Sequence, residues 1–168
     1  TTLFRSDRDG WFHTGDAGYL KDSHLYLTER IKDLFKTSNG KYISPQALET
    51  KLAIDRYIDQ IAVIADERKF VSALIVPVYG FVKDYAKEKG IAYSNMDELL
   101  QHPKIQALFR ARIDTLQQQF AHYEQVKRFT LLTEPFSMER GELTNTLKLK
   151  RSVVAKNYKG LIDKMYEE

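Results

Sequence analysis

The chain has no cysteine among its 168 residues, which excludes disulfide bonds, thiolate-bound zinc and a cysteine nucleophile. It has only four histidines, and none has the HExxH spacing of a helical zinc site. We therefore expect no metal site, and we expect the histidines to lie at the surface or at helix caps; they are His13, His24, His102 and His122. There is also no glycine-rich phosphate loop of the Walker or Rossmann type, and no pattern that indicates a Ser-His-Asp triad.

Long hydrophobic runs are missing as well. The longest one, residues 73–82, is interrupted by Pro77 and Gly80 and is too short to span a bilayer. The 26 basic and 23 acidic residues leave a net charge of only +3, which argues against nucleic acid as the main partner and leaves acidic metabolites open. A cytoplasmic location is compatible with this composition, and peripheral membrane association is left open. Because the first residue is Thr1 rather than Met, we expect a piece of a longer protein whose N-terminal signals are not visible.

The apolar pattern predicts an α+β fold with one core of ordinary domain size. Segments 58–65 and 71–78 are rich in β-branched residues and are expected to pair as antiparallel strands, with 126–132 as a third strand. Helices are expected to flank this small antiparallel or mixed sheet of about three main strands. They are predicted at 81–89, 95–100 and 103–120, followed by a closing helix or helix pair broken near Gly160.

The first part of the chain is expected to hold two smaller strand pairs. Segments 17–20 and 24–27 flank a polar turn and predict a β-hairpin. Segments 34–37 and 41–43 enclose Asn39-Gly40, a pair that supplies the positive φ angles of a tight turn. A helix is then predicted to begin at Ser44-Pro45, because serine caps a helix well and proline suits its first position.

The first candidate site is Thr14-Gly15-Asp16. An ionised carboxylate offers two acceptor oxygens, so that Asp16 beside a glycine turn could bind both hydroxyls of a vicinal diol such as a ribose. Taken alone, however, the tripeptide favours a plain turn-capping role for this aspartate.

The second candidate is segment 30–36, RIKDLFK. If it were a strand, Arg30, Lys32, Leu34 and Lys36 would point to one side, which leaves no clean apolar face. Such a segment is a poor interior strand. A mobile or interdomain connection and a solvated edge strand explain it equally well.

The third candidate is segment 141–151, GELTNTLKLKR, in which Lys148 and Lys150 alternate with leucines. A lysine on a packed backbone can neutralise charge that develops on a phosphate or a carboxylate. Without further context, a solvated basic strand is the better interpretation of this segment.

Taken together and in this order, the three segments resemble the C-terminal part of the adenylate-forming superfamily, and most closely its long-chain fatty acid–CoA ligases. WFHTGD at 11–16 is similar to the family's W-[FYL]-x-T-G-D segment, and Arg30 falls on the arginine of its linker. KTSNGKYISPQALE at 36–49 resembles the signature K-x-x-x-G-x-x-[IV]-x-P-x-x-[IL]-E. LTNTLKLKR at 143–151 resembles the C-terminal lysine motif. The resemblance covers nearly the whole chain.

This resemblance implies a role for each candidate residue. Asp16 and Arg30 would bind the ribose hydroxyls of ATP. Lys32 would be the hinge about which a small domain rotates between two half-reactions, and Gly40 would lie in a loop near the tunnel for CoA.

The resemblance also implies a two-step reaction. A fatty acid, with ATP and Mg²⁺, would form acyl-AMP and release pyrophosphate, and CoA would then take the acyl group and release AMP. Lys148 would reach the acyl carboxylate and the α-phosphate in the first step. Lys150 would take that role if the register of the motif moved by two residues.

Two domains follow from the resemblance. Residues 1–31 would end a large N-terminal domain, and 32–168 would form the mobile C-terminal domain. The large domain would hold the acyl tunnel, the metal and most ATP contacts, so that this chain alone would be inactive. Two alternatives stay open: an adenylating enzyme for an aryl or amino acid, and a non-catalytic α+β module that binds another protein.

Overall fold

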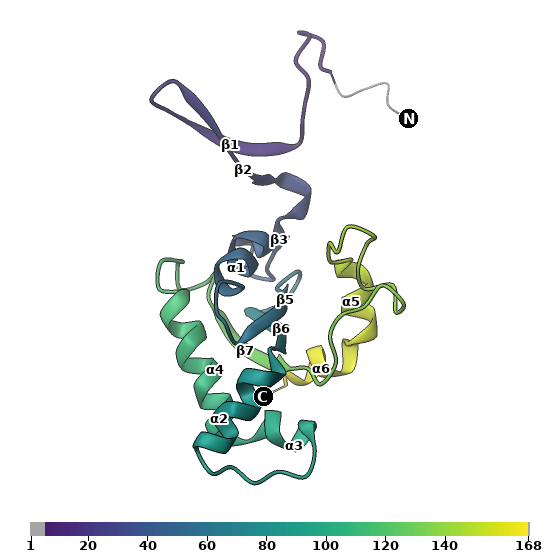
Figure 1. The fold of residues 1–168 in the computed structure, drawn as a ribbon. Helices are drawn as coiled ribbons and strands as arrows, with labels where there is room; N and C mark the ends of the chain where they lie inside the picture. Colours follow the sequence, from purple (N-terminus) through teal and green to yellow (C-terminus); the bar gives the residue numbers. More distant parts are fainter. Residues whose placement is uncertain (1–5, 168) are drawn as a thin grey trace.

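The structure is a computed structural model that describes residues 6–167, and its architecture is α+β, as predicted. A mixed three-stranded sheet in the order β5-β6-β7 forms the centre of the main body, with helices on both of its faces (Figure 1). A hairpin of β1 (Asp16–Lys21) and β2 (His24–Arg30) projects away from this body (Figure 1). The short strands β3 (Phe35–Lys36) and β4 (Tyr42–Ile43) follow it at the point where the body begins.

The central sheet combines antiparallel and parallel pairing. β5 (Ile58–Ile64) pairs antiparallel with β6 (Val71–Pro77), as predicted, and β7 (Val126–Leu131) pairs with β6 in parallel. Every residue of β6 is buried, because this strand is central and covered on both faces. The parallel pairing requires a crossover connection, which here consists of α2 (Tyr79–Glu88), α3 (Met96–Gln101) and α4 (Pro103–Leu116).

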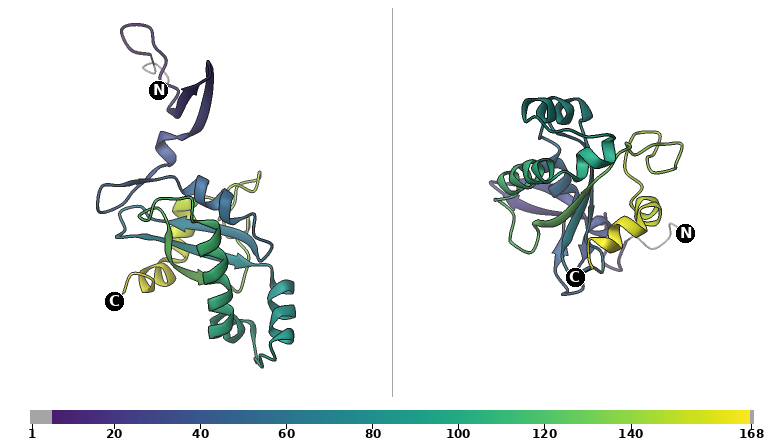
Figure 2. Two further views of the ribbon diagram at one scale, coloured as in Figure 1. Left: turned by 90° about the vertical axis from the view of Figure 1, so that its left-hand side faces the viewer. Right: turned by 90° about the horizontal axis from the view of Figure 1, so that it is seen from below.

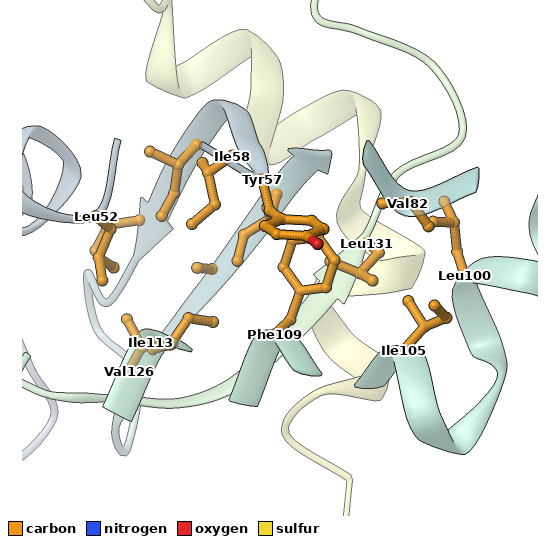
Figure 3. Close-up of a cluster of buried hydrophobic side chains, with 14 of the residues drawn as sticks. Leu52, Tyr57, Ile58, Val82, Leu100, Ile105, Phe109, Ile113, Val126 and Leu131 are labelled. Carbon is orange, nitrogen blue, oxygen red and sulfur yellow. The ribbon is translucent and has the colours of Figure 1, made fainter. Parts of the chain in front are cut away.

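Successive side chains of the strands enter two different cores, because they alternate between the faces of the sheet. Val63 and Ile75 join the larger core. Helix α1 (Pro45–Leu52) and the crossover helices cover this core and contribute side chains such as Leu52, Phe109 and Ile105 to it (Figure 3). Ala62 and Leu74 join the smaller core on the opposite face. α5 (Arg151–Asn157) and α6 (Lys159–Lys164) cover that face (Figure 2).

Most predicted helices begin where their capping residues indicated. α1 (Pro45–Leu52) starts at the predicted proline, and the Oγ of Ser44 accepts a hydrogen bond from the N–H of Ala47 at 3.3 Å. The closing element is the helix pair α5 and α6, which breaks at Tyr158, just before the predicted Gly160.

α4 is shorter than predicted, because it ends at Leu116 rather than at residue 120. Gln117 explains this end. Its buried side chain accepts a hydrogen bond from the backbone N–H of Val126 at 2.8 Å, which ties the end of the helix to the first residue of β7.

Both predicted small strand pairs are present. β1 (Asp16–Lys21) and β2 (His24–Arg30) are joined by a two-residue turn in which Asp22 and Ser23 both have positive φ, the conformation of a type I′ hairpin. β3 (Phe35–Lys36) and β4 (Tyr42–Ile43) are shorter than predicted, and Gly40 between them has a φ of +75°.

Two strand interpretations were wrong. Segment 30–36 is not one strand: β2 ends at Arg30, a 3-10 turn follows at Ile31–Asp33, and the N–H of Leu34 closes this turn on the carbonyl of Ile31. The alternation of side chains assumed for this segment therefore does not exist. Segment 141–151 is not a basic strand either, because it forms a turn closed by one isolated bridge and then the first residue of α5.

The histidines lie where the sequence predicted. His102 caps α4, since its Nδ1 accepts a hydrogen bond from the N–H of Lys104 at 3.2 Å. The other three, His13, His24 and His122, are exposed. None of the helices in the part of the chain that the structure describes is both long enough and apolar enough to cross a bilayer.

Candidate functional site

Asp16 and Arg30 lie opposite each other across β1 and β2. The Nε of Arg30 is 3.3 Å from Oδ1 of Asp16, and the side chains are 73% and 26% exposed. The structure therefore brings together the two residues that the sequence assigned to a ribose. They form a carboxylate and guanidinium pair that remains open to solvent.

This pairing depends on a β-bulge between Ala17 and Gly18. In a regular ladder Glu29, rather than Arg30, would lie opposite Asp16, and two carboxylates would meet across the strands. A bulge adds one residue to a strand and so re-aims the side chains beyond it. Gly18 suits this place, because a Cβ there would come within 2.5 Å of a backbone carbonyl oxygen of β2.

Gly40 lies in a five-residue turn, 37–41, between β3 and β4. The N–H of Thr37 donates to the carbonyl of Lys41 at 2.9 Å, and the N–H of Gly40 donates to the carbonyl of Thr37 at 2.8 Å. The ammonium of Lys41 lies 5.5 Å from the ring centroid of Tyr123, in cation–π geometry.

Lys148 ends a second five-residue turn, 144–148. Its N–H donates to Oγ1 of Thr144 at 3.0 Å, and its carbonyl accepts the N–H of Thr144 at 2.8 Å. The Lys148 side chain is exposed, and within residues 6–167 its ammonium has no hydrogen-bond or ion-pair partner. This cation is therefore available to an anionic ligand.

Lys150, the alternative lysine, lies at the base of this turn rather than within it. Its N–H donates to the carbonyl of Glu142 at 2.7 Å, and α5 begins at the next residue. A bridge between Leu143 and Leu149 closes the base just above it. The Lys150 side chain is also exposed.

A buried carboxylate anchors the start of this segment. Glu142 is fully buried, and it accepts hydrogen bonds from the N–H of Ser137 at 3.0 Å, from Nε of Arg140 at 3.1 Å and from Nδ2 of Asn157 at 3.1 Å. Burial alone would raise the pKa of Glu142, but the bonds from Arg140, Ser137 and Asn157 outweigh it, and the pKa is lowered.

A second ion pair anchors the end of the segment. Arg151 donates two hydrogen bonds to Glu49 of α1, both at 2.6 Å. Sequence reasoning included both residues in motifs but did not pair them, and it assigned no role to Glu142, which lies in the third candidate segment. No spacing in a single sequence signals such contacts, because the partners come from distant segments.

The predicted site residues do not form one cluster. Among the contacts of the described residues, none joins Lys148 to Asp16, Arg30 or Gly40. The backbone of Lys32, the predicted hinge, lies in the 3-10 turn after β2, and its side chain lies outside the part of the structure that is described. No group of three or more histidine, aspartate or glutamate side chains among those that the structure describes could hold a metal ion.

Comparison with known proteins identifies the family. The chain matches the AMP-binding enzyme C-terminal domain over residues 32–168, and it belongs to this family. The peroxisomal long chain acyl-CoA synthetase 7 of Arabidopsis thaliana is 36% identical over 166 residues, covering 96% of this chain and 24% of that protein. Long-chain-fatty-acid–CoA ligase 5 of Rattus norvegicus is 36% identical over 168 residues, with the same coverage of both chains. This chain thus spans about a quarter of the length of these relatives.

A solved structure supports the same fold. The adenylation domain of a carboxylate reductase from Mycobacterium chelonae superposes with a TM-score of 0.77 at 24% identity, covering 98% of this chain and 24% of that one. The resemblance to the C-terminal domain of an adenylate-forming enzyme is confirmed, since family and fold agree.

Proposed function

We propose that this chain is the C-terminal part of a long-chain fatty acid–CoA ligase, which forms acyl-AMP from a fatty acid and ATP and then transfers the acyl group to CoA. The observation that carries the nucleotide part of the proposal is the cross-strand pair of Asp16 and Arg30. The acid is inferred from the two relatives named above, which are a long-chain acyl-CoA synthetase and a long-chain fatty acid ligase.

The pair of Asp16 and Arg30 fits a ribose in its chemistry. The Arg30 guanidinium lies at Oδ1 of Asp16 and orients the carboxylate, while no contact of the described residues engages Oδ2. Oδ2 can therefore accept from a sugar hydroxyl, and the exposed guanidinium of Arg30 can donate to the neighbouring one. ATP would supply the phosphoryl group that becomes part of acyl-AMP.

Lys148 acts in the first half-reaction. A carboxylate and a triphosphate are both anions, so that bringing them together requires positive charge at the point of attack. The free ammonium of Lys148 supplies this charge, and Mg²⁺ held by the preceding domain would add to it on the phosphates. In the second half-reaction the domain rotates about Lys32, which removes Lys148 and brings the Gly40 turn toward CoA.

The division into residues 1–31 and 32–168 has two supports. The family match begins at residue 32. In addition, Leu20, Leu25 and Leu27 of the first hairpin are 78, 64 and 66% exposed. A two-stranded hairpin with such an apolar surface is marginal by itself, so that packing against a preceding domain would bury it.

The role of Lys148 is tested in the longer enzyme of which, as we infer, this chain is a part. Lys148→Ala is expected to abolish fatty-acid-dependent pyrophosphate exchange and to spare thioester formation from supplied acyl-AMP. Lys150→Ala is the matched control and is expected to retain exchange. Equal loss of both half-reactions in Lys148→Ala would argue against the assignment, and loss of exchange in Lys150→Ala alone would move the role to that residue.

A screen of acids tests the substrate class separately. Long-chain fatty acids are expected to support pyrophosphate exchange better than aryl acids or amino acids.

The chain of 168 residues without a preceding domain is expected to support neither half-reaction, because most ATP contacts would be missing.

A further inference from the structure

Two turns of this chain have the same construction although they are far apart in the sequence. Each begins with threonine and ends with lysine: residues 37–41 are TSNGK and residues 144–148 are TNTLK. In both, the threonine N–H donates to the lysine carbonyl, at 2.9 and 2.8 Å, and the N–H of the fourth residue donates to the threonine carbonyl at 2.8 Å. In both, the lysine N–H also donates to the threonine Oγ1, at 3.2 and 3.0 Å. We call them the Thr–Lys turns.

The two Thr–Lys turns differ at their fourth residue. Gly40 has a φ of +75°, and Leu147 has a φ of +59°. Glycine adopts such an angle freely, whereas an L-residue with a side chain is strained there. Burial does not explain the leucine, because its side chain is 67% exposed. Strain of this kind persists only where the surrounding structure fixes it, and it is concentrated at functional sites.

Thr144 fixes the strained conformation. Its backbone N–H and its Oγ1 both bond to the backbone of Lys148, and its carbonyl accepts the N–H of Leu147. Its Oγ1 also lies 3.1 Å from that of Thr146. All hydrogen-bonding groups of this one residue are therefore engaged within the turn, and two of them hold Lys148 directly.

The ends of the turn are fixed to the body of the domain as well. The bridge from Leu143 to Leu149 closes the turn, and the ion pair of Arg151 with Glu49 attaches the following helix to α1. The backbone of Lys148 is thus set before any ligand arrives, and its side chain is the only part left to rotate.

We propose that Thr144 and Leu147 position Lys148 for the adenylation step, Thr144 through its hydrogen bonds and Leu147 through its left-handed backbone conformation. This inference rests on the function proposed for Lys148. A cation helps the attack of one anion on another only when it is already aimed at the point where they meet. Misplacement of such a group by 1 Å can cost about 100-fold in rate. The left-handed residue sets the direction of the chain into Lys148, and Thr144 keeps it there.

Thr144→Val tests the hydroxyl in the longer enzyme, because valine keeps the shape of threonine and removes the acceptor. Pyrophosphate exchange is expected to fall about 100-fold, while thioester formation from supplied acyl-AMP and the midpoint of urea unfolding stay near those of the wild type. Thr144→Ser restores the acceptor and is expected to recover most of the exchange rate. Asn145→Ala changes an exposed neighbour that has no hydrogen bond to Lys148 among the described residues, and it is expected to leave exchange unchanged.

Leu147 allows an independent test of the backbone conformation. Leu147→Ile keeps the size and hydrophobicity of the side chain, but a β-branched residue resists positive φ. Leu147→Asn changes the chemistry completely, but asparagine tolerates this region. Exchange is expected to fall in the isoleucine variant and to be retained in the asparagine variant. The reverse order would mean that the leucine acts through apolar contact, and it would overturn the inference.

Lys148→Ala, measured in parallel, separates two kinds of failure. If this variant keeps pyrophosphate exchange, the function proposed for Lys148 is wrong. If it loses exchange while Thr144→Val and Leu147→Ile do not, or if these two variants lose both half-reactions equally, the positioning role alone is overturned.

Discussion

Glu49 in α1 and Arg151 at the start of α5 form a two-point ion pair although 102 positions separate them in the sequence. Oε1 of Glu49 also accepts the backbone N–H of Val63 in β5 at 2.8 Å. The guanidinium of Arg151 in addition lies over the ring of Phe35, 5.5 Å from its centroid. One pair of side chains thus joins α1, β3 and β5 to the base of the turn that carries Lys148.

Glu49→Gln is expected to lower the free energy of unfolding by about 2 kcal/mol, because it leaves the partly buried charge of Arg151 without its partner. Urea unfolding of the 168-residue chain measures the change. Glu88→Gln is the control, since Glu88 pairs with Lys89 on the surface and the loss of this pair should cost much less. An equal decrease in the free energy of unfolding in both variants would contradict the stabilising role given to the pair of Glu49 and Arg151.

The buried carboxylate of Glu142 predicts a dependence of stability on pH. Its pKa lies below the ordinary 4.5, since the hydrogen bonds of Arg140, Ser137 and Asn157 outweigh the effect of burial. The unfolded chain therefore binds a proton to this group more readily than the folded chain does. The stability that the carboxylate contributes is fully present above pH 4.5 and is lost as the pH falls through the lower folded pKa.

Urea unfolding of the wild type and of Glu142→Gln, from neutral pH to below pH 4.5, tests this dependence. The difference in the free energy of unfolding between the two proteins should be largest at neutral pH and should shrink on acidification. If the difference stayed constant over the whole range, the pKa of Glu142 would not be lowered by folding.

Gly40→Ala is expected to lower the free energy of unfolding by about 1 kcal/mol, because an alanine is strained at a φ of +75°. The cost should be conformational only, since no atom lies within 4 Å of the position a Cβ would take. Gly80→Ala is a control with the opposite sign: the site is equally open, but it is the second residue of α2, where alanine is favoured over glycine. In thermal unfolding, the midpoint temperature should fall for Gly40→Ala and rise for Gly80→Ala.

Lys32→Pro in the longer enzyme is expected to slow thioester formation more than pyrophosphate exchange. Proline restricts φ at residue 32 and disfavours helical angles at Ile31, whereas a hinge has to adopt more than one set of backbone angles. Lys32→Ala leaves the backbone free and should have a much smaller effect on either half-reaction. If exchange fell in the proline variant as far as thioester formation did, residue 32 would not be the hinge.

The parts of the fold that depend on residues close together in the sequence were predictable from it. Ser44 and Pro45 define the start of α1 by local capping, and the paired strands β5 and β6 need only a short polar connection. The direction of β7 was left open, because parallel pairing depends on how the whole crossover packs. The 3-10 turn after Arg30 was missed for a different reason: no residue in this turn has a strong preference for that conformation.

In the candidate site, too, local motifs were predictable from the sequence and long-range geometry was not. Motifs placed Asp16 and Arg30 at one ligand, but the bulge that brings them face to face leaves no trace in composition or periodicity. The Thr–Lys turns could have been found by comparing TSNGK with TNTLK, yet the positive φ of Leu147 contradicts the ordinary preference of leucine. Local rules fail at such positions because the surrounding contacts override them.

The crossover between β6 and β7 has a consequence for the order of folding. Contacts between segments close in sequence form at a lower entropic cost than contacts that close long loops. We therefore expect the paired strands β5 and β6 to become ordered early, and β7 to join them only after α2, α3 and α4 have collapsed onto the sheet. The pair of Glu49 and Arg151 closes a loop of 102 positions, so that the turn carrying Lys148, although its own bonds are local, takes its final place against α1 late in folding.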